Sequence, residues 1–212
     1  MAANVTNTVA LVFNGIGSVW GSRPELAGQG EWIKRIVAAA VLGGAAGAVL
    51  LLSTPAEGFE KVVPVLLGFA SVAILLPRAK GPEDHVPGRP GHAVRKTLEG
   101  GTIFLITIYG GYFGAASGVL LLALLLHAGG ATLAHASAGK NLVLGVANCV
   151  AALIFALFAP VSWAAVLPMG IGGLLGARLG PIVIRHAPAT PLRLLIGTGG
   201  MVLAAKLAVD TY

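Results

Sequence analysis

Residues 141–177 read NLVLGVANCVAALIFALFAPVSWAAVLPMGIGGLLGA, and none of them carries a charged side chain. A helix needs about 20 predominantly apolar residues to cross the roughly 30 Å hydrocarbon core of a membrane. No Asp or Glu occurs between Gly100 and Val209, so this half of the chain is expected to cross several times. The sequence therefore predicts an all-α fold, a polytopic bundle of transmembrane helices.

The composition of the whole chain agrees with this prediction. Of 212 residues, 56% are hydrophobic and 10% are charged, whereas about a quarter of the residues are charged in an average soluble protein. The formal charge of +6 would also suit a nucleic-acid-binding protein. The basic residues are scattered near predicted helix ends without an aromatic-interleaved patch, which favours loop charges that set membrane topology. The single cysteine, Cys149, excludes an internal disulfide.

Seven apolar segments and one long polar connection are predicted along the chain. The segments span residues 4–21, 33–52, 60–77, 102–127, 138–159, 163–184 and 191–209. The connection divides the chain into a first repeat (1–77, three transmembrane helices), a polar linker (78–100) and a second repeat (101–212). The second repeat holds a glycine-rich broken helix and three transmembrane helices. If each segment crosses once, the linker side carries more Lys and Arg, which predicts a cytoplasmic linker. The alternative for segment 102–127 is that it re-enters rather than crosses.

The two halves carry the same landmarks in the same order, which predicts an internal duplication. The landmarks are two asparagines seven residues apart, a tryptophan, a glycine cluster and a later glycine. They are Asn7, Asn14, Trp32, GGAAGA (43–48) and Gly68 in one half, and Asn141, Asn148, Trp163, GGLLGA (172–177) and Gly197 in the other. The segment at 102–130 has no counterpart in the first half. The first repeat is therefore expected to be truncated by one helix-sized element, through a natural deletion or a mis-assigned start.

The glycine-rich segment is the first candidate for a substrate-binding site. Its candidate residues are Gly110, Gly111, Gly114, Ser117 and Gly118. Each glycine disfavours a helix by about 1 kcal/mol relative to alanine, and a helix broken at membrane depth leaves backbone N–H groups that must face protein or a wet cavity. The start of the following half-helix would attract an anion. The spacing of four between three of these glycines equally favours a smooth surface for helix packing.

Four asparagines and one lysine complete the predicted site. Asn7 and Asn14 lie two helical turns apart on one face, as do Asn141 and Asn148. A buried amide needs hydrogen-bond partners, so these faces are expected to point into the protein, where the amides bind an anion or bond a neighbouring helix. Lys140 would either draw anions into the site or extend toward the membrane surface as a helix-end lysine.

No catalytic residue, metal site or cofactor is expected, and the protein is not expected to be an enzyme. Ser117 could form a hydrolase set with His127 and His135, but His127 lies roughly 15 Å further along if the segment is helical. His85 and His92 lack a ligand cluster, and no nucleotide-binding loop is present. The expected partners are the lipid bilayer and a small anionic solute, with a second copy of the chain left open and nucleic acid excluded.

Four stretches of the chain carry a recognisable pattern. They are IYGGYFGAASGVLLL (108–122), KNLVLGVANCVAALIF (140–155), SWAAVLPMGIGGLLGARLG (162–180) and LRLLIG (192–197). Together they resemble the TauE/SafE family of sulfite and organosulfonate exporters, with matches at the four glycines of the broken segment and at Lys140 and Asn141. Family members often have a further glycine where this chain has Ser117, and the family's opening glycine-rich helix is not found here. The resemblance implies a bacterial inner-membrane transporter with a duplicated helical core.

Two functions from different classes follow from these features. The first is a secondary carrier or facilitator for a small anion such as sulfite, an organosulfonate or a related sulfur or carboxylate compound. Because intramembrane proton relays commonly use Asp or Glu, the lack of carboxylates predicts coupling through the anion's own proton or simple facilitation. The second is a non-transporting scaffold derived from a truncated transporter. An in-frame glycine-rich helix encoded upstream of Met1 would favour the transporter, and an immediate stop codon would favour the scaffold.

Overall fold

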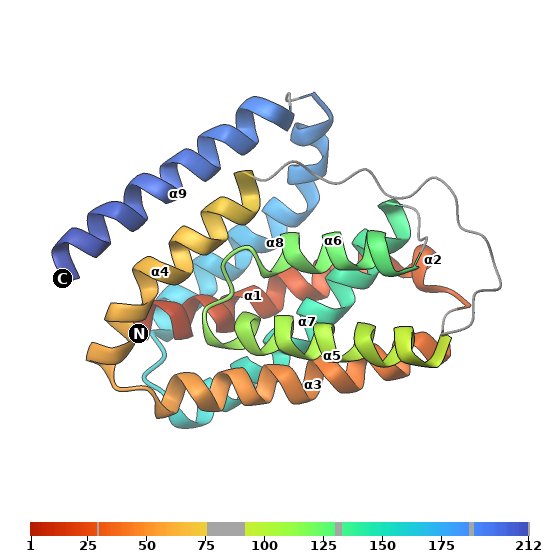
Figure 1. Cartoon of the computed structure of the whole chain (residues 1–212), viewed down its shortest axis with the longest axis horizontal. Coiled ribbons are helices and arrows are strands. Elements are labelled where there is room, and N and C mark those ends of the chain that lie inside the picture. Colours follow the sequence, from red (N-terminus) through yellow and green to blue (C-terminus); the bar gives the residue numbers. More distant parts are fainter. Residues whose placement is uncertain (29, 76–91, 130–132, 187–188, 212) are drawn as a thin grey trace.

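The chain folds into a bundle of helices (Figure 1). The computed structural model describes residues 1–212 apart from 29, 76–91, 130–132, 187–188 and 212. Within these described residues there are helices and short connections but no strand, which confirms the all-α prediction. The helices are α1 (Ala2–Gly21), α2 (Arg23–Leu26), α3 (Gly30–Ser53), α4 (Ala56–Leu75), α5 (His92–Tyr112), α6 (Ser117–Gly129), α7 (Leu133–Phe158), α8 (Trp163–His186) and α9 (Ala189–Thr211).

The predicted apolar segments correspond to the long helices, with one difference at residues 102–127. This segment forms two helices, α5 and α6, which run side by side in opposite directions and meet in a turn (Figure 1). The outer ends of the pair therefore lie at the same end of the bundle. Because α5 begins at His92, the last part of the predicted linker is helical, while residues 78–91 lie outside the described part. The short α2 is not among the predicted segments.

Two described helices are both long enough and apolar enough to cross a membrane. They are Gly30–Ser53 and Ala134–Phe158, and shorter apolar helices lie at Ser117–Leu126 and Trp163–Ala177. Large apolar side chains also cover the outside of the bundle, where Leu105, Leu157 and Val202 are 65%, 75% and 71% exposed. An apolar outer surface of this kind suits contact with lipid better than contact with water. The number of crossings remains a prediction.

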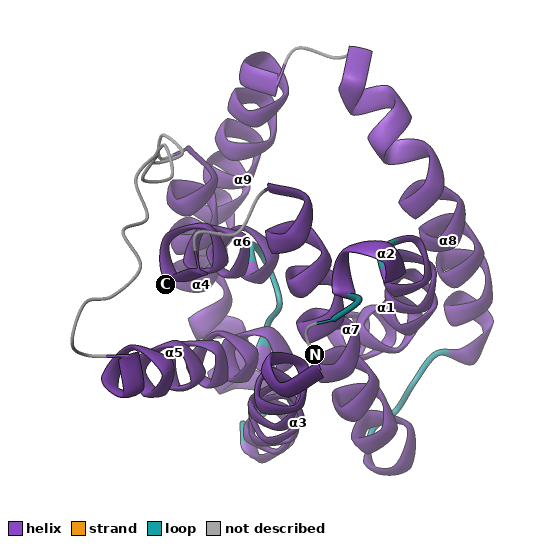
Figure 2. Ribbon diagram, turned by 90° about the vertical axis from the view of Figure 1, so that its right-hand side faces the viewer, coloured by secondary structure: helices purple, strands orange, loops and turns teal. Residues whose placement is uncertain are grey.

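The core of the bundle is built around α7, which packs against both α1 and α3. α3 packs against α5 and α7, whereas α1 packs against α7 and α8. α4 and α9 pair with each other at the side of the bundle, and α8 lies at its outer edge (Figures 1 and 2). Two groups of buried apolar side chains hold the centre together. One includes Val5, Leu51 and Phe155, and the other includes Ile36 and Val143.

α1 and α7, the helices that carry the matched asparagines, run antiparallel. Near the start of α7, Asn141 Nδ2 donates a hydrogen bond to Ser22 Oγ at the end of α1 (3.1 Å). At the other end of the pair, Val5 of α1 and Phe155 of α7 belong to the same buried group. Opposite directions are expected for an inverted repeat, whose equivalent helices are related by a two-fold axis in the membrane plane. The arrangement supports an inverted form of the predicted duplication.

Glycines on α3 allow backbone contact with the helices on either side. A Cβ added at Gly44 would lie 2.6 Å from the carbonyl oxygen of Ala147 on α7. One added at Gly43 would lie 2.7 Å from the carbonyl oxygen of Phe104 on α5. Small residues permit this close approach of helices. Gly172 on α8 is the counterpart of Gly43 in the second half. A Cβ added at Gly172 has nothing within 4 Å, so the two glycine clusters have different surroundings.

Candidate functional site

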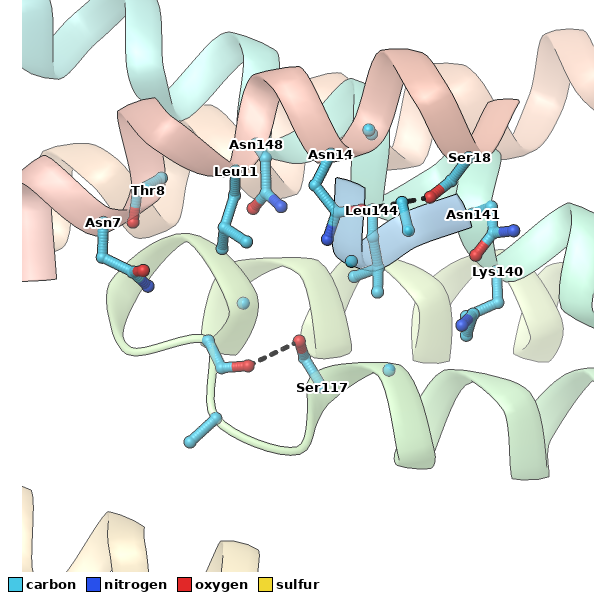
Figure 3. Close-up of a pocket in the computed structure, with 18 of the residues that line it drawn as sticks. Asn7, Thr8, Leu11, Asn14, Ser18, Ser117, Lys140, Asn141, Leu144 and Asn148 are labelled. Atoms are coloured by element: carbon cyan, nitrogen blue, oxygen red, sulfur yellow. Dashed lines mark hydrogen bonds between the residues drawn. The ribbon is translucent and has the colours of Figure 1, made fainter. Parts of the chain in front are cut away.

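The chain reverses direction between α5 and α6 in the short turn 113–116. Gly114 has a φ of +81° and Ala116 a φ of +59°, both in the left-handed region where glycine is least strained. The break thus lies inside the glycine-rich segment, where its glycine content predicted an interruption. The turn faces α1 and α7 across a hollow (Figure 3).

A cavity of about 890 Å³ lies between this turn and the helices α1, α7 and α8. Small-molecule sites typically enclose about 300–1,000 Å³, so its size suits a small solute. All predicted site residues except Gly111 line this cavity (Figure 3). They are Asn7, Asn14, Gly110, Gly114, Ser117, Gly118, Lys140, Asn141 and Asn148. The structure therefore brings together residues that lie far apart in the sequence.

Gly111 faces α3 instead of the cavity. A Cβ added there would lie 2.8 Å from the carbonyl oxygen of Gly44 and 3.3 Å from the backbone nitrogen of Ala48. Its neighbour Gly110 is also buried but lines the cavity near Ser117. Gly111 therefore belongs to the contact between α3 and α5, which corrects its place among the predicted site residues.

Lys140 brings a positive charge to the cavity. Its half-buried side chain extends toward the start of α6, where its Cδ would lie 3.7 Å from a Cβ added at Gly118. In the described part of the chain Lys140 has no ion-pair partner, and no Asp or Glu is among the residues that line the cavity. An unpaired ammonium group in a cavity favours the entry of a negatively charged solute.

Two of the four asparagines of the cavity form side-chain hydrogen bonds within the protein, and two do not. Asn141 bonds to the end of α1, and Asn14 Oδ1 accepts a hydrogen bond from Ser18 Oγ (3.3 Å). For Asn7 and Asn148, the described residues offer no side-chain hydrogen bond. Each of these two amides can donate two hydrogen bonds and accept others, so both are available to a solute. Hydrogen bonds within the protein explain the placement of Asn14 and Asn141. Contact of Asn7 and Asn148 with a solute is a prediction.

Backbone N–H groups at the start of α6 add further donors. The N–H groups of Val119 and Leu120 bond to the carbonyl oxygen of Ala116. The N–H of Gly118 has no acceptor among the described residues. The first N–H groups of a helix carry a partial positive charge. Because Gly118 lies beside Lys140, one anion could contact both.

Three polar residues that line the cavity are not among the predicted site residues: Thr8, Ser18 and Ser137. Ser18 lies one helical turn after Asn14, and Ser137 lies one turn before Asn141, so each shares a helix face with a predicted site residue. This spacing could have revealed both serines. No pattern in the sequence distinguishes Thr8.

The sequence matches the model of a known protein family. The family model described as "Sulfite exporter TauE/SafE" matches residues 1–207. The chain belongs to the TauE/SafE family. The match includes every residue that lines the cavity, and it confirms the resemblance found in the sequence.

Curated relatives of this TauE/SafE chain include Escherichia coli proteins named "Probable membrane transporter protein YfcA". Those of strains K12, O6:H1 and O157:H7 are each 28% identical to it over 176 residues. The aligned residues make up 83% of this chain and 64% of each relative, so the chain spans less than two thirds of the relatives' length. No solved structure matches the chain.

Gly114→Ala is expected to destabilise this TauE/SafE chain by about 1–2 kcal/mol, because an L-residue is strained in the left-handed region. The added Cβ would also lie 3.2 Å from the carbonyl oxygen of Gly110. Thermal unfolding in detergent measures the effect. Gly100→Ala on α5 is the matched control, since an added Cβ there meets nothing within 4 Å. Equal melting temperatures for the two variants would contradict this role of Gly114.

Proposed function

We propose that this chain is a membrane carrier for a small anion. The observation that carries the proposal is the half-buried ammonium group of Lys140, which has no ion-pair partner in the described structure. The described residues that line its cavity include no Asp or Glu. A carboxylate would neutralise the lysine and repel an anion, whereas this lining leaves the positive charge available to a solute.

The neutral donors of the cavity suit reversible binding. The amides of Asn7 and Asn148 and the N–H of Gly118 can each donate a hydrogen bond to an anion's oxygen atoms. None of them adds a second positive charge. Conduction requires binding that is favourable enough for entry and weak enough for release. A single charge with neutral donors, as the described lining has, suits a carrier better than a cluster of cations.

The finer proposal concerns the substrate. We infer a small sulfur oxyanion such as sulfite, an organosulfonate or a related carboxylate. The description of the family supports sulfite, and the name of the relatives supports membrane transport. Because the described cavity residues include no carboxylate that could relay a proton, the carrier is a facilitator or couples through the anion's own proton.

We place the linker side of the protein in the cytoplasm of a bacterial cell. The α5–α6 pair returns to the side from which it enters (Figure 1), which is the re-entrant alternative for segment 102–127. α7 then begins on the linker side. If each of the other long helices crosses once, every Lys and Arg except Lys61 and Lys206 falls on the linker side. Basic residues concentrate on the cytoplasmic side of membrane proteins. The returning pair therefore supports this orientation more strongly than a single crossing does.

Solute flux into proteoliposomes tests the proposed function. The purified protein is expected to accelerate the uptake of at least one of sulfite, methanesulfonate and lactate down an imposed gradient, compared with protein-free vesicles. Uptake of glycerol, a neutral solute, is expected to stay at the protein-free rate. No acceleration with any anion would contradict the proposal, and equal acceleration of glycerol would contradict it by indicating an unselective leak.

A further inference from the structure

Two side chains outside the cavity bond to the end of α5 and to the turn that follows it. Asn4 Nδ2 of α1 donates a hydrogen bond to the carbonyl oxygen of Tyr112 at the end of α5 (2.9 Å). The hydroxyl of Tyr109 donates one to the carbonyl oxygen of Ala115 in the turn (2.7 Å). Neither Asn4 nor Tyr109 is among the residues that line the cavity. Asn4 therefore contacts the end of α5, and Tyr109 contacts the turn, rather than the cavity beside them.

The hydroxyl of Tyr109 reaches the turn from the side of α4. The Tyr109 ring contacts Phe69 of α4 and Phe113 of the turn, with ring centroids 6.4 Å apart in each pair. The cavity lies on the other side of the turn, toward α1 and α7 (Figure 3). The carbonyl of Ala115 is thus bonded on the side away from the cavity.

Bonding of these carbonyl groups also fixes the neighbouring N–H groups. A peptide group is planar and trans, so its N–H points opposite to its C=O. The bond from Tyr109 to the Ala115 carbonyl therefore sets the direction of the Ala116 N–H. In the same way, the bond from Ser117 Oγ to the Gly114 carbonyl (2.8 Å) sets the direction of the Ala115 N–H. Neither of these N–H groups has an acceptor among the described residues, and Ala115 lines the cavity whereas Ala116 does not.

We propose that Tyr109 and Asn4 are positioning residues, which hold the turn and the end of α5 so that the free N–H groups of Ala115 and Gly118, two residues that line the cavity, face an anion there. This inference rests on the proposed function for its ligand, an anion with oxygen acceptors. Removal of the Tyr109 hydroxyl leaves the Ala115 carbonyl without a donor, and an unpaired polar group is costly in an apolar setting. The turn then rearranges to satisfy that carbonyl, and the N–H donors lose their orientation.

Tyr109→Phe compared with Tyr112→Phe tests the inference. The two substitutions remove the same atom from the same helix, but the Tyr112 hydroxyl makes no hydrogen bond in the described structure. Tyr109→Phe is expected to raise the KM for anion uptake about three- to tenfold, which corresponds to one net hydrogen bond. Vmax is expected to change little, and Tyr112→Phe is expected to leave both constants unchanged. Asn4→Ala is expected to raise KM in the same way. If Tyr109→Phe does not fold, Asn4→Ala is compared with Tyr112→Phe instead.

Hydrogen exchange gives a second readout, which does not depend on transport. The hydrogen-bonded amides of Phe113, Gly114 and Ser117 are expected to exchange faster in Tyr109→Phe than in the unmodified protein or in Tyr112→Phe. Equal exchange in the two variants overturns the inference. Faster exchange with an unchanged KM overturns it too, because a bond that is merely structural would behave in that way. Absence of flux in the unmodified protein would contradict the proposed function, while the exchange comparison still decides whether these residues hold the turn.

Discussion

Lys140→Gln is expected to raise the KM for the transported anion by about 10- to 100-fold, because a hydrogen bond to a charged group contributes about 1.5–3 kcal/mol. The substitution keeps a polar side chain of similar length and removes the positive charge. The stem of the side chain can still pack beside Gly118, so the fold of the cavity should be retained. Initial rates of uptake into proteoliposomes over a range of anion concentrations measure the effect.

Three further lysine variants separate the charge of Lys140 from other effects. Lys34→Gln is the matched control, because Lys34 is exposed, pairs with Glu31 (2.8 Å) and does not line the cavity. Lys140→Arg keeps the charge and is expected to retain most of the uptake, whereas Lys140→Glu is expected to abolish it by repelling the anion. An unchanged KM in Lys140→Gln would mean that the charge of Lys140 does not contribute to binding of the anion.

The positions of the helices were predictable because membrane thickness dictates the length of each apolar run. The predicted segment 163–184 and the observed α8 both begin at Trp163, for example. The path of the chain through 102–127 was not predictable in the same way. A high glycine content indicates that a helix breaks, but the direction in which the chain continues depends on partners distant in sequence. Asn4 is one such partner, since it bonds to the end of α5 from the other end of the chain.

The asparagines of the candidate site were easier to place than its glycines. Asn141 and Asn148 must share a helix face because they lie seven residues apart, and a polar face in an apolar helix is expected to turn inward. Gly110 and Gly111 offer no such signal, because a glycine has no side chain whose polarity distinguishes the inner face. Only the packing of Gly111 against Gly44 on α3 decides that it faces away from the cavity.

Gly43→Val is expected to lower the free energy of unfolding by about 3 kcal/mol, near the upper end of the usual cost of overpacking. A Cβ at Gly43 would overlap Thr107 Oγ1 and lie 2.7 Å from the carbonyl oxygen of Phe104. The hydroxyl of Thr107 could rotate away, but the Phe104 carbonyl belongs to the backbone of α5 and cannot. The two helices must therefore separate, which opens the contact that also holds the glycine-rich end of α5 in place.

Gly172→Val is the matched control, because Gly172 occupies the equivalent position in the glycine cluster of the second half. An added Cβ there has nothing within 4 Å, so this variant is expected to melt close to the unmodified protein. Gly43→Val is expected to melt roughly 6–12 °C lower, from a shift of about 2–4 °C per kcal/mol for a chain of this size. If the melting temperature falls equally in both variants, the effect comes from valine within a helix and not from the helix contact at Gly43. If the melting temperature falls more in Gly43→Val, the glycine motif permits close helix contact in the first half, whereas in the second half no neighbouring helix requires a glycine at this position.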